Sequence, residues 1–154
     1  MNAIRIRNDA FIDQAIDHTA WGGVFRPGMV PSDVDAVFHV RYVLDSAGRI
    51  LMADFKHGLW DWGNMSRGQW TMYRSFVAAG RGDIVAAICS HQSPAARRID
   101  SRRDVTQFNV CWNAGSQVAM WHKPRPGRVW EEFVRDWYNG PPRPFAAKWL
   151  RADQ

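Results

Sequence analysis

The pattern of apolar and polar positions along the 154 residues predicts an alternation of helices and strands. In residues 9–20 the apolar side chains recur at helical spacing and Asp9 is suited to cap the first turn, which predicts a short amphipathic helix. Residues 34–44 and 49–55 are rich in β-branched and aromatic side chains. A short turn at residues 46–48 separates them, so the two strands are expected to pair as a hairpin.

The second half of the chain continues this alternation. Its pattern predicts a helix over residues 66–79, a strand over 83–90, two strands over 105–112 and 116–122 joined by a turn at 113–115, and a helix over 128–138. The polar stretch between the third and fourth strands, residues 91–104, is expected to form a loop. A proline cluster then ends the last helix and begins a proline-rich tail over about residues 139–154.

This order of elements predicts an α/β fold in a single domain spanning residues 1–154. The length is typical of one compact domain, and a hydrophobic content of 46% is sufficient for a core. We expect a central mixed sheet that begins with the hairpin. The first helix, the helix over 66–79 and the last helix are expected to flank it.

The charge of the chain is compatible with a phosphate-rich partner. Lys and Arg number 20 against 15 Asp and Glu, which gives a formal net charge of +5. A solvated surface accounts for the same surplus. A possible track for a nucleic-acid backbone, with a solvated loop as the alternative, consists of Arg97, Arg98, Arg102, Arg103, Lys123, Arg125 and Arg128.

Several features point to a cytoplasmic protein. The first residues carry acids and lack the apolar core of a secretory signal, and no apolar run has the length of a membrane span. Cys89 and Cys111 lie in apolar segments without a CxxC partner, which predicts buried free thiols in a reducing compartment. No histidine or cysteine pattern indicates zinc.

Three charged residues fall at matching ends of the predicted hairpin. Asp35 opens the first strand, and Asp54 and Lys56 end the second. Because side chains alternate between the two faces of a strand, Asp54 and Lys56 share a face and Phe55 points to the other.

These charged residues are suited to bind a metal ion. Unpaired buried charges are costly, and a divalent cation relieves the repulsion between two carboxylates. Mg²⁺ is the natural candidate, with Mn²⁺ as a substitute. Alone, the Asp-x-Lys pattern also fits a solvated salt bridge.

Together with a motif on the next predicted helix, Asp35, Asp54 and Lys56 resemble the motifs of a known protein family. The segments PSDVDAVF and ILMADFKHG, followed by QWTMY on the helix, resemble the D…(D/E)xK and QxxxY motifs of the PD-(D/E)xK nuclease superfamily in its RecB-like branch. The likeness covers roughly residues 31–80. Gln69 and Tyr73 in the last motif are one helical turn apart and therefore share a face.

The resemblance implies a restriction-endonuclease-like core and metal-dependent hydrolysis of DNA by an endo- or exonuclease. It implies that Asp35, Asp54 and the Phe55 carbonyl hold the metal ion and that Lys56 organises the attacking water. It further implies that Gln69 and Tyr73 steady the site or the DNA. The compact size and the absence of a recognisable specificity domain suggest, by analogy, a small phage or mobile-element enzyme. The sequence leaves open whether the chain forms a homodimer to cut both strands.

The chain departs from the family pattern on its first predicted helix. Many members place a glutamate there near the metal, whereas this segment offers Asp13 and Asp17, which also fit a solvated polar face. Asp33 precedes the first strand and fits either an assisting ligand or a turn residue. The metal's full ligand set is therefore not determined by the sequence.

Other candidates have structural alternatives. Trp60 and Trp62 follow the lysine and fit either stacking on an unpaired base or packing beneath the loop. His57 is expected on the face opposite Lys56, in a structural or phosphate-contacting role. The alternative to a nuclease is a basic DNA-binding or assembly protein that keeps the nuclease fold without turnover. A chance match in a structural protein is a third possibility.

Overall fold

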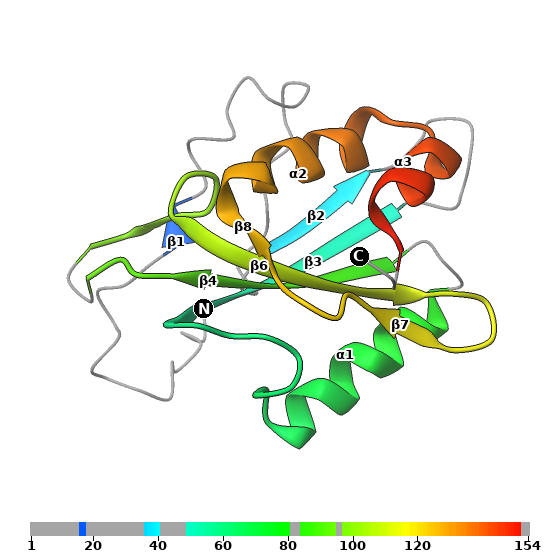
Figure 1. Cartoon of the computed structure of the whole chain (residues 1–154), viewed down its shortest axis with the longest axis horizontal. Coiled ribbons are helices and arrows are strands. Elements are labelled where there is room, and N and C mark those ends of the chain that lie inside the picture. Colours follow the sequence, from blue (N-terminus) through cyan, green and yellow to red (C-terminus); the bar gives the residue numbers. More distant parts are fainter. Residues whose placement is uncertain (1–15, 18–35, 41–48, 81–83, 95–96, 152–154) are drawn as a thin grey trace, which may run out of the picture.

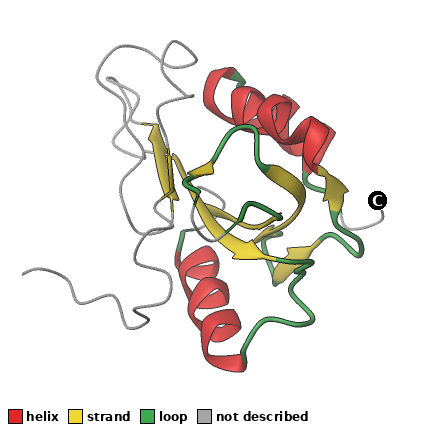
Figure 2. Cartoon of the chain, turned by 90° about the vertical axis from the view of Figure 1, so that its left-hand side faces the viewer, coloured by secondary structure: helices red, strands yellow, loops and turns green. Residues whose placement is uncertain are grey.

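A mixed β-sheet lies between two layers of helices in the computed structural model, which describes residues 16–17, 36–40, 49–80, 84–94 and 97–151 (Figures 1 and 2). The strands of this sheet are β2 (Ala36–Val40), β3 (Arg49–His57), β4 (Ile84–His91), β6 (Val105–Asn113), β7 (Val118–Met120) and β8 (Arg125–Pro126). The helices are α1 (Arg67–Ala79), α2 (Trp130–Asn139) and α3 (Pro142–Trp149), and the 3-10 turn η3 (Gly127–Val129) precedes α2.

The sheet order β2-β3-β4-β6-β7 confirms the expected central mixed sheet, with β8 also paired to β6. β2 and β3 are antiparallel, with Ala36 opposite Ala53, as the hairpin prediction required. β4 runs parallel to β3 because α1 carries the chain back across the sheet between them. β6 and β7 form a second hairpin, in which Gly115 adopts a φ of 96° that favours glycine.

Helix α1 begins where the sequence predicts. The Ser66 side chain accepts a hydrogen bond from the Gln69 backbone N–H, which satisfies a donor that the first helical turn leaves free. Gly80 ends the helix with a hydrogen bond from its N–H to the Phe76 carbonyl. The buried face of α1, centred on Tyr73 and Val77, packs against one side of the sheet.

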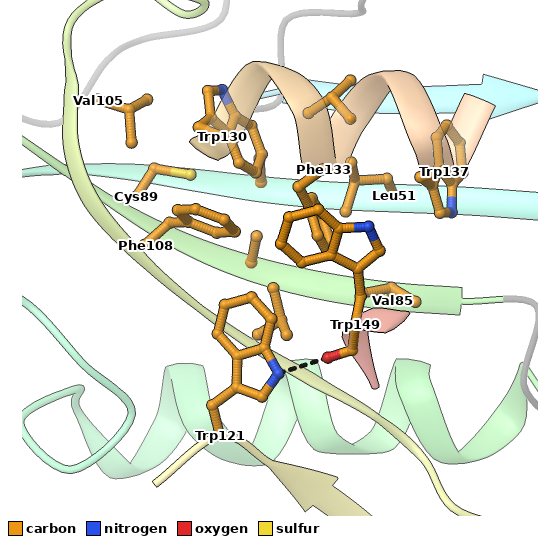
Figure 3. Packing of buried hydrophobic residues seen from close by; sticks show 14 of the residues in the cluster. Leu51, Val85, Cys89, Val105, Phe108, Trp121, Trp130, Phe133, Trp137 and Trp149 are labelled. Carbon is orange, nitrogen blue, oxygen red and sulfur yellow. Dashed lines mark hydrogen bonds between the residues drawn. The ribbon is translucent and has the colours of Figure 1, made fainter. Parts of the chain in front are cut away.

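Helices α2 and α3 cover the other side of the sheet, where most buried tryptophans gather (Figure 3). Phe133 of α2 is fully buried and has aromatic rings around it with centroids 5.3–6.0 Å away, those of Phe108, Trp121, Trp130, Phe145 and Trp149. The indole of Trp121 donates a hydrogen bond of 2.7 Å to the Trp149 carbonyl. The tryptophan-rich composition therefore mainly builds this core.

The structure corrects two expectations about the N-terminal and central segments. The helix expected over 9–20 is wrong at residues Ile16–Asp17, which form strand β1 and pair in parallel with β5 (Ile99–Asp100). The rest of that segment lies outside the described residues. The pairing also places a strand in residues 91–104, which were expected to be a loop throughout. Two-residue strands give no periodicity from which to recognise them, because their pairing is a tertiary contact.

The proline-rich tail contains a helix that the sequence analysis did not predict. The break after α2 is confirmed, since Gly140 at its end is extended, with φ −83° and ψ 146°. Pro142 then begins α3, and proline is favourable at a first helical position because its missing N–H would have no helical partner there. Phe145 and Trp149, one turn apart, are both buried against the core. The segment is thus anchored by apolar burial.

Acid is expected to weaken the contact between α2 and α3. Although burial raises the pKa of Asp136, hydrogen bonds from Lys148 and the Trp149 indole hold it below the ordinary value. A lowered pKa stabilises the fold fully above the ordinary Asp pKa of about 3.9, and this contribution is lost as the pH falls through the lower folded value. Urea unfolding measured from about pH 5 down to pH 2 should show a smaller loss of stability for Asp136→Asn than for the wild type. Parallel stability curves would contradict this role.

No helix within the described ranges is long and apolar enough to cross a membrane.

Candidate functional site

The candidate site lies at the carboxyl end of β3, on the sheet face that α1 covers. Asp54 and Lys56 share this face, as strand alternation predicts, and the Lys56 Nζ lies 3.1 Å from the Asp54 Oδ2. Phe55 between them points into the core on the opposite face. The expected sharing of one face by the acid and the amine is confirmed.

The ion pair differs from a solvated salt bridge because the carboxylate is buried. The Asp54 side chain is 2% exposed, while that of Lys56 is 23% exposed. The second carboxylate oxygen, Asp54 Oδ1, is buried and has no hydrogen-bond partner among the described residues. Leaving a charged oxygen without a partner costs free energy, so Oδ1 is the atom of this site most suited to accept a ligand.

Asp35 lies outside the described residues, as do Asp13 and Asp33. The described part of β2 begins at the next residue, Ala36, which pairs with Ala53. Within the described chain, β3 therefore extends beyond β2 over residues 54–57 and pairs there with β4 alone.

A row of polar side chains crosses the sheet beside Lys56. Lys56 pairs with Ser90 of β4, and Ser90 pairs with Gln107 of β6, so the three lie on one face. The fully buried Ser90 accepts a 2.8 Å hydrogen bond at its Oγ from the Trp60 backbone N–H. Gln107 donates from Nε2 to the Trp60 carbonyl at 3.2 Å. The row therefore fixes the start of the loop that follows Lys56.

The two tryptophans of that loop are turned mainly toward the protein. Trp62 is 4% exposed and packs against Trp70 and Tyr73, with ring centroids 5.3 and 5.8 Å apart. Trp60 is partly buried and donates its indole N–H to the His57 carbonyl at 2.8 Å. Of the two alternatives, the structure supports packing for Trp62. Leu59 is instead the exposed apolar side chain of the loop, at 68% exposure.

Gln69 and Tyr73 have different surroundings on α1. Gln69 lies in the first turn, where its side-chain oxygen accepts a hydrogen bond of 3.3 Å from Ser66 Oγ. Tyr73 is buried against Trp62 in the core beneath the loop. Gln69 therefore contacts the last residue before the helix, and Tyr73 contacts the loop that follows Lys56. A direct role of either in chemistry remains a prediction.

Three titratable groups on β4 and β6 have shifted pKa values, namely Cys89, His91 and Cys111. Burial, and next the charge of Asp54, raise the pKa of the Cys89 thiol, and burial also raises that of Cys111. Both cysteines are buried and free, as predicted. Burial and then the charge of His57 lower the pKa of His91, although Asp104 opposes this. The rings of His57 and His91 meet edge to face at 5.4 Å. Neither thiol is therefore an available nucleophile at neutral pH.

Much of the predicted arginine track is engaged within the protein. Arg97 pairs with Asp104 at 2.8 Å, Arg102 with Glu131 at 2.7 Å, and Arg103 with Asp100 at 3.6 Å. The guanidinium of Arg125 lies 4.2 Å from the centroid of Trp121 and 5.2 Å from that of Trp149. Arg98 and Lys123 are exposed. These contacts orient the arginines, and phosphate binding by this set remains a prediction.

Sequence analysis did not single out three residues that build the site. Ser90 and Gln107 position the loop, and Leu59 is exposed at its start. A weak signal was present, because Ser90 is a polar residue at the end of an apolar run. The pairing of β4 with β6 that brings Gln107 beside it is a long-range contact, which local sequence does not encode.

No family model, curated protein or solved structure matches the chain significantly. Among the described residues, no three His, Cys, Asp or Glu side chains converge as a metal-binding group. The described share of the predicted ligand set consists of Asp54 and the backbone of Phe55.

Proposed function

We propose that this protein is a metal-dependent deoxyribonuclease that hydrolyses phosphodiester bonds at the end of β3. The observation that carries the proposal is the buried Asp54 with one oxygen paired to Lys56 and the other without a partner in the described chain. A structural ion pair gives no reason to bury the second oxygen without a partner, whereas a bound cation would supply the partner that this oxygen lacks.

The order of elements supports the same proposal. An antiparallel strand pair and then the helix with Gln69 and Tyr73 follow one another, which is the order in which the motifs of the resemblance occur. The restriction-endonuclease-like core is thus proposed as the particular form of the observed α/β architecture. The net charge of +5 favours a polyanionic substrate.

The residues at the site suit a Mg²⁺ or Mn²⁺ ion. Asp54 Oδ1 would bind the ion, together with the Phe55 carbonyl and, as the resemblance implies, Asp35. When bound, the ion would lower the pKa of a water molecule and neutralise charge on the phosphoryl group.

Lys56 is the described cation at this site that can act on the reacting groups. Its ammonium is held by Asp54, and its side chain is 23% exposed to solvent. From this position it would orient the attacking water and stabilise the negative charge that grows on the phosphoryl oxygens. The water oxygen forms a bond to phosphorus and gives up a proton to solvent, while the bond to the leaving sugar oxygen breaks and that oxygen takes up a proton from solvent. The products are a phosphate monoester end and a hydroxyl end.

Replacing Lys56 by methionine is expected to lower DNA cleavage by about a hundredfold or more, because the variant loses a charge aimed at the transition state. Purified protein would be incubated with plasmid, linear duplex and single-stranded DNA in Mg²⁺, Mn²⁺ or EDTA, and initial rates compared. Lys148→Met is the matched control, since Lys148 forms lysine–carboxylate pairs with Glu132 and Asp136 on the α2–α3 layer.

Two results would contradict the proposal. Cleavage that survives Lys56→Met at the wild-type rate would remove Lys56 from the site. Metal-independent DNA binding with no cleavage of any substrate would favour the alternative of a DNA-binding or assembly protein without turnover.

A further inference from the structure

Leu59 is held outward by a loop whose backbone is bonded on each side of it. The Gly58 N–H donates to the His91 carbonyl at 2.9 Å, and the Trp60 N–H donates to Ser90 Oγ at 2.8 Å. The Leu59 carbonyl itself accepts a hydrogen bond of 3.0 Å from Asn64 Nδ2. Gly58 has a φ of 100°, a value that L side chains rarely adopt, and this turns the chain sharply after β3.

The exposure of Leu59 is therefore built into the loop. Its neighbour Trp60 is partly buried and hydrogen-bonded, and Trp62 is almost fully buried, so the loop has turned its aromatic rings inward. Leu59 remains 68% exposed, more than Met72 at 44% and Phe76 at 47%, the other large apolar side chains exposed in the described chain. A single exposed leucine is common on protein surfaces, so what makes this side chain a candidate DNA contact is its place in the chain, three residues after Lys56.

The position of Leu59 connects this contact to the candidate site. It follows Lys56 by three residues, and the serine that fixes the next residue, Trp60, pairs directly with Lys56 across β3 and β4. A nucleic acid whose phosphate reaches Lys56 would therefore bring its neighbouring bases near this apolar side chain. Leucine side chains are among the apolar wedges that proteins insert between base steps, and the faces of bases are the apolar surface that DNA offers to them.

We infer that Leu59 is a wedge that inserts between bases next to the scissile phosphate, so that DNA with readily unstacked bases is the preferred substrate. This inference rests on the proposed nuclease function. Base pairs at mismatches or frayed ends cost less to unstack than those in a continuous duplex. A substrate that is already open needs the wedge less, and this difference separates wedging from general binding.

The test compares initial rates on two end-labelled duplexes of one sequence, one fully paired and one with a short mismatched bubble. The wild type should cleave the bubble faster. Leu59→Ala should lower kcat/KM on the paired duplex by about tenfold and on the bubble by less than about threefold, since the bubble is already unstacked. Leu59→Met should retain most of the activity on both. Met72→Ala, which shortens another exposed apolar side chain, is the matched control.

A binding measurement separates wedging from loss of fold or turnover. With 2-aminopurine beside the cleavage position and EDTA present to prevent cleavage, fluorescence should rise when the wild-type protein binds. Leu59→Ala should abolish that rise while circular dichroism stays unchanged. Equal effects of Leu59→Ala on both duplexes, or no effect on either, would overturn the wedge while the nuclease proposal stands. Absence of cleavage by the wild type on any DNA would overturn the nuclease proposal, and the wedge with it.

Discussion

Replacing Asp54 by asparagine is expected to lower the rate of metal-dependent cleavage by about a thousandfold, while making the metal-free protein more stable by about 1 kcal/mol. The amide keeps the shape of the side chain but removes the negative charge from an oxygen that is buried without a partner in the described chain. Lys56 is 23% exposed and can be hydrated when its partner is lost. Activity and stability should therefore change in opposite directions.

The two effects are measured separately. Cleavage is followed on labelled DNA, and stability by urea unfolding in EDTA. Thermal unfolding with added Mg²⁺ gives a third readout, because a ligand at one hundred times its Kd stabilises the folded state by about 2.7 kcal/mol. This gain should be present in the wild type and absent in Asp54→Asn.

The control for Asp54→Asn is Asp136→Asn, which neutralises an aspartate paired with Lys148 in the α2–α3 layer. It should leave cleavage and the Mg²⁺ effect unchanged. If Asp54→Asn instead destabilises the metal-free protein strongly and leaves the Mg²⁺ effect intact, Asp54 is a structural partner of Lys56 and not a metal ligand.

Replacing Phe133 by alanine is expected to lower the free energy of unfolding by about 3–5 kcal/mol, a large share of the stability of a domain of this size. Phe133 is fully buried at the centre of the α2–α3 layer, and its ring lies 5.3 Å from those of Phe108 and Phe145 (Figure 3 shows Phe108). Removing the Phe133 ring opens a cavity, and the surrounding aromatic rings cannot move enough to fill it because they are flat and rigid. Urea unfolding followed by tryptophan fluorescence measures the loss.

Phe76→Ala is the matched control on α1, where the side chain is 47% exposed. It should change the free energy of unfolding by less than about 0.5 kcal/mol. A similar small change for Phe133→Ala would show that the contact between α2, α3 and the sheet contributes little to the fold.

Much of the architecture could be predicted from the chain because its elements have local signals. The apolar, β-branched and aromatic residues of β3 and β6, the apolar run of β4 and the helical spacing of apolar residues in α1 are all readable within a few residues. α3 could not be recognised in the same way, because prolines dominate its first turn and burial of Phe145 and Trp149 on the core holds it. β1 and β5 likewise depend on each other across the fold.

For the candidate site, too, the local sequence determines some properties and tertiary contacts determine the others. The spacing of Asp54 and Lys56 determined by itself that the two side chains share a face, since that follows from the two-residue repeat of a strand. Only the tertiary structure decided that this is a buried pair, with a carboxylate 2% exposed and one oxygen unused within the described chain. Burial depends on α1 and its loop covering the sheet, and the exposure of Leu59 depends on hydrogen bonds from β4 and Asn64. Such properties arise from contacts between segments distant in sequence, and local patterns do not specify them.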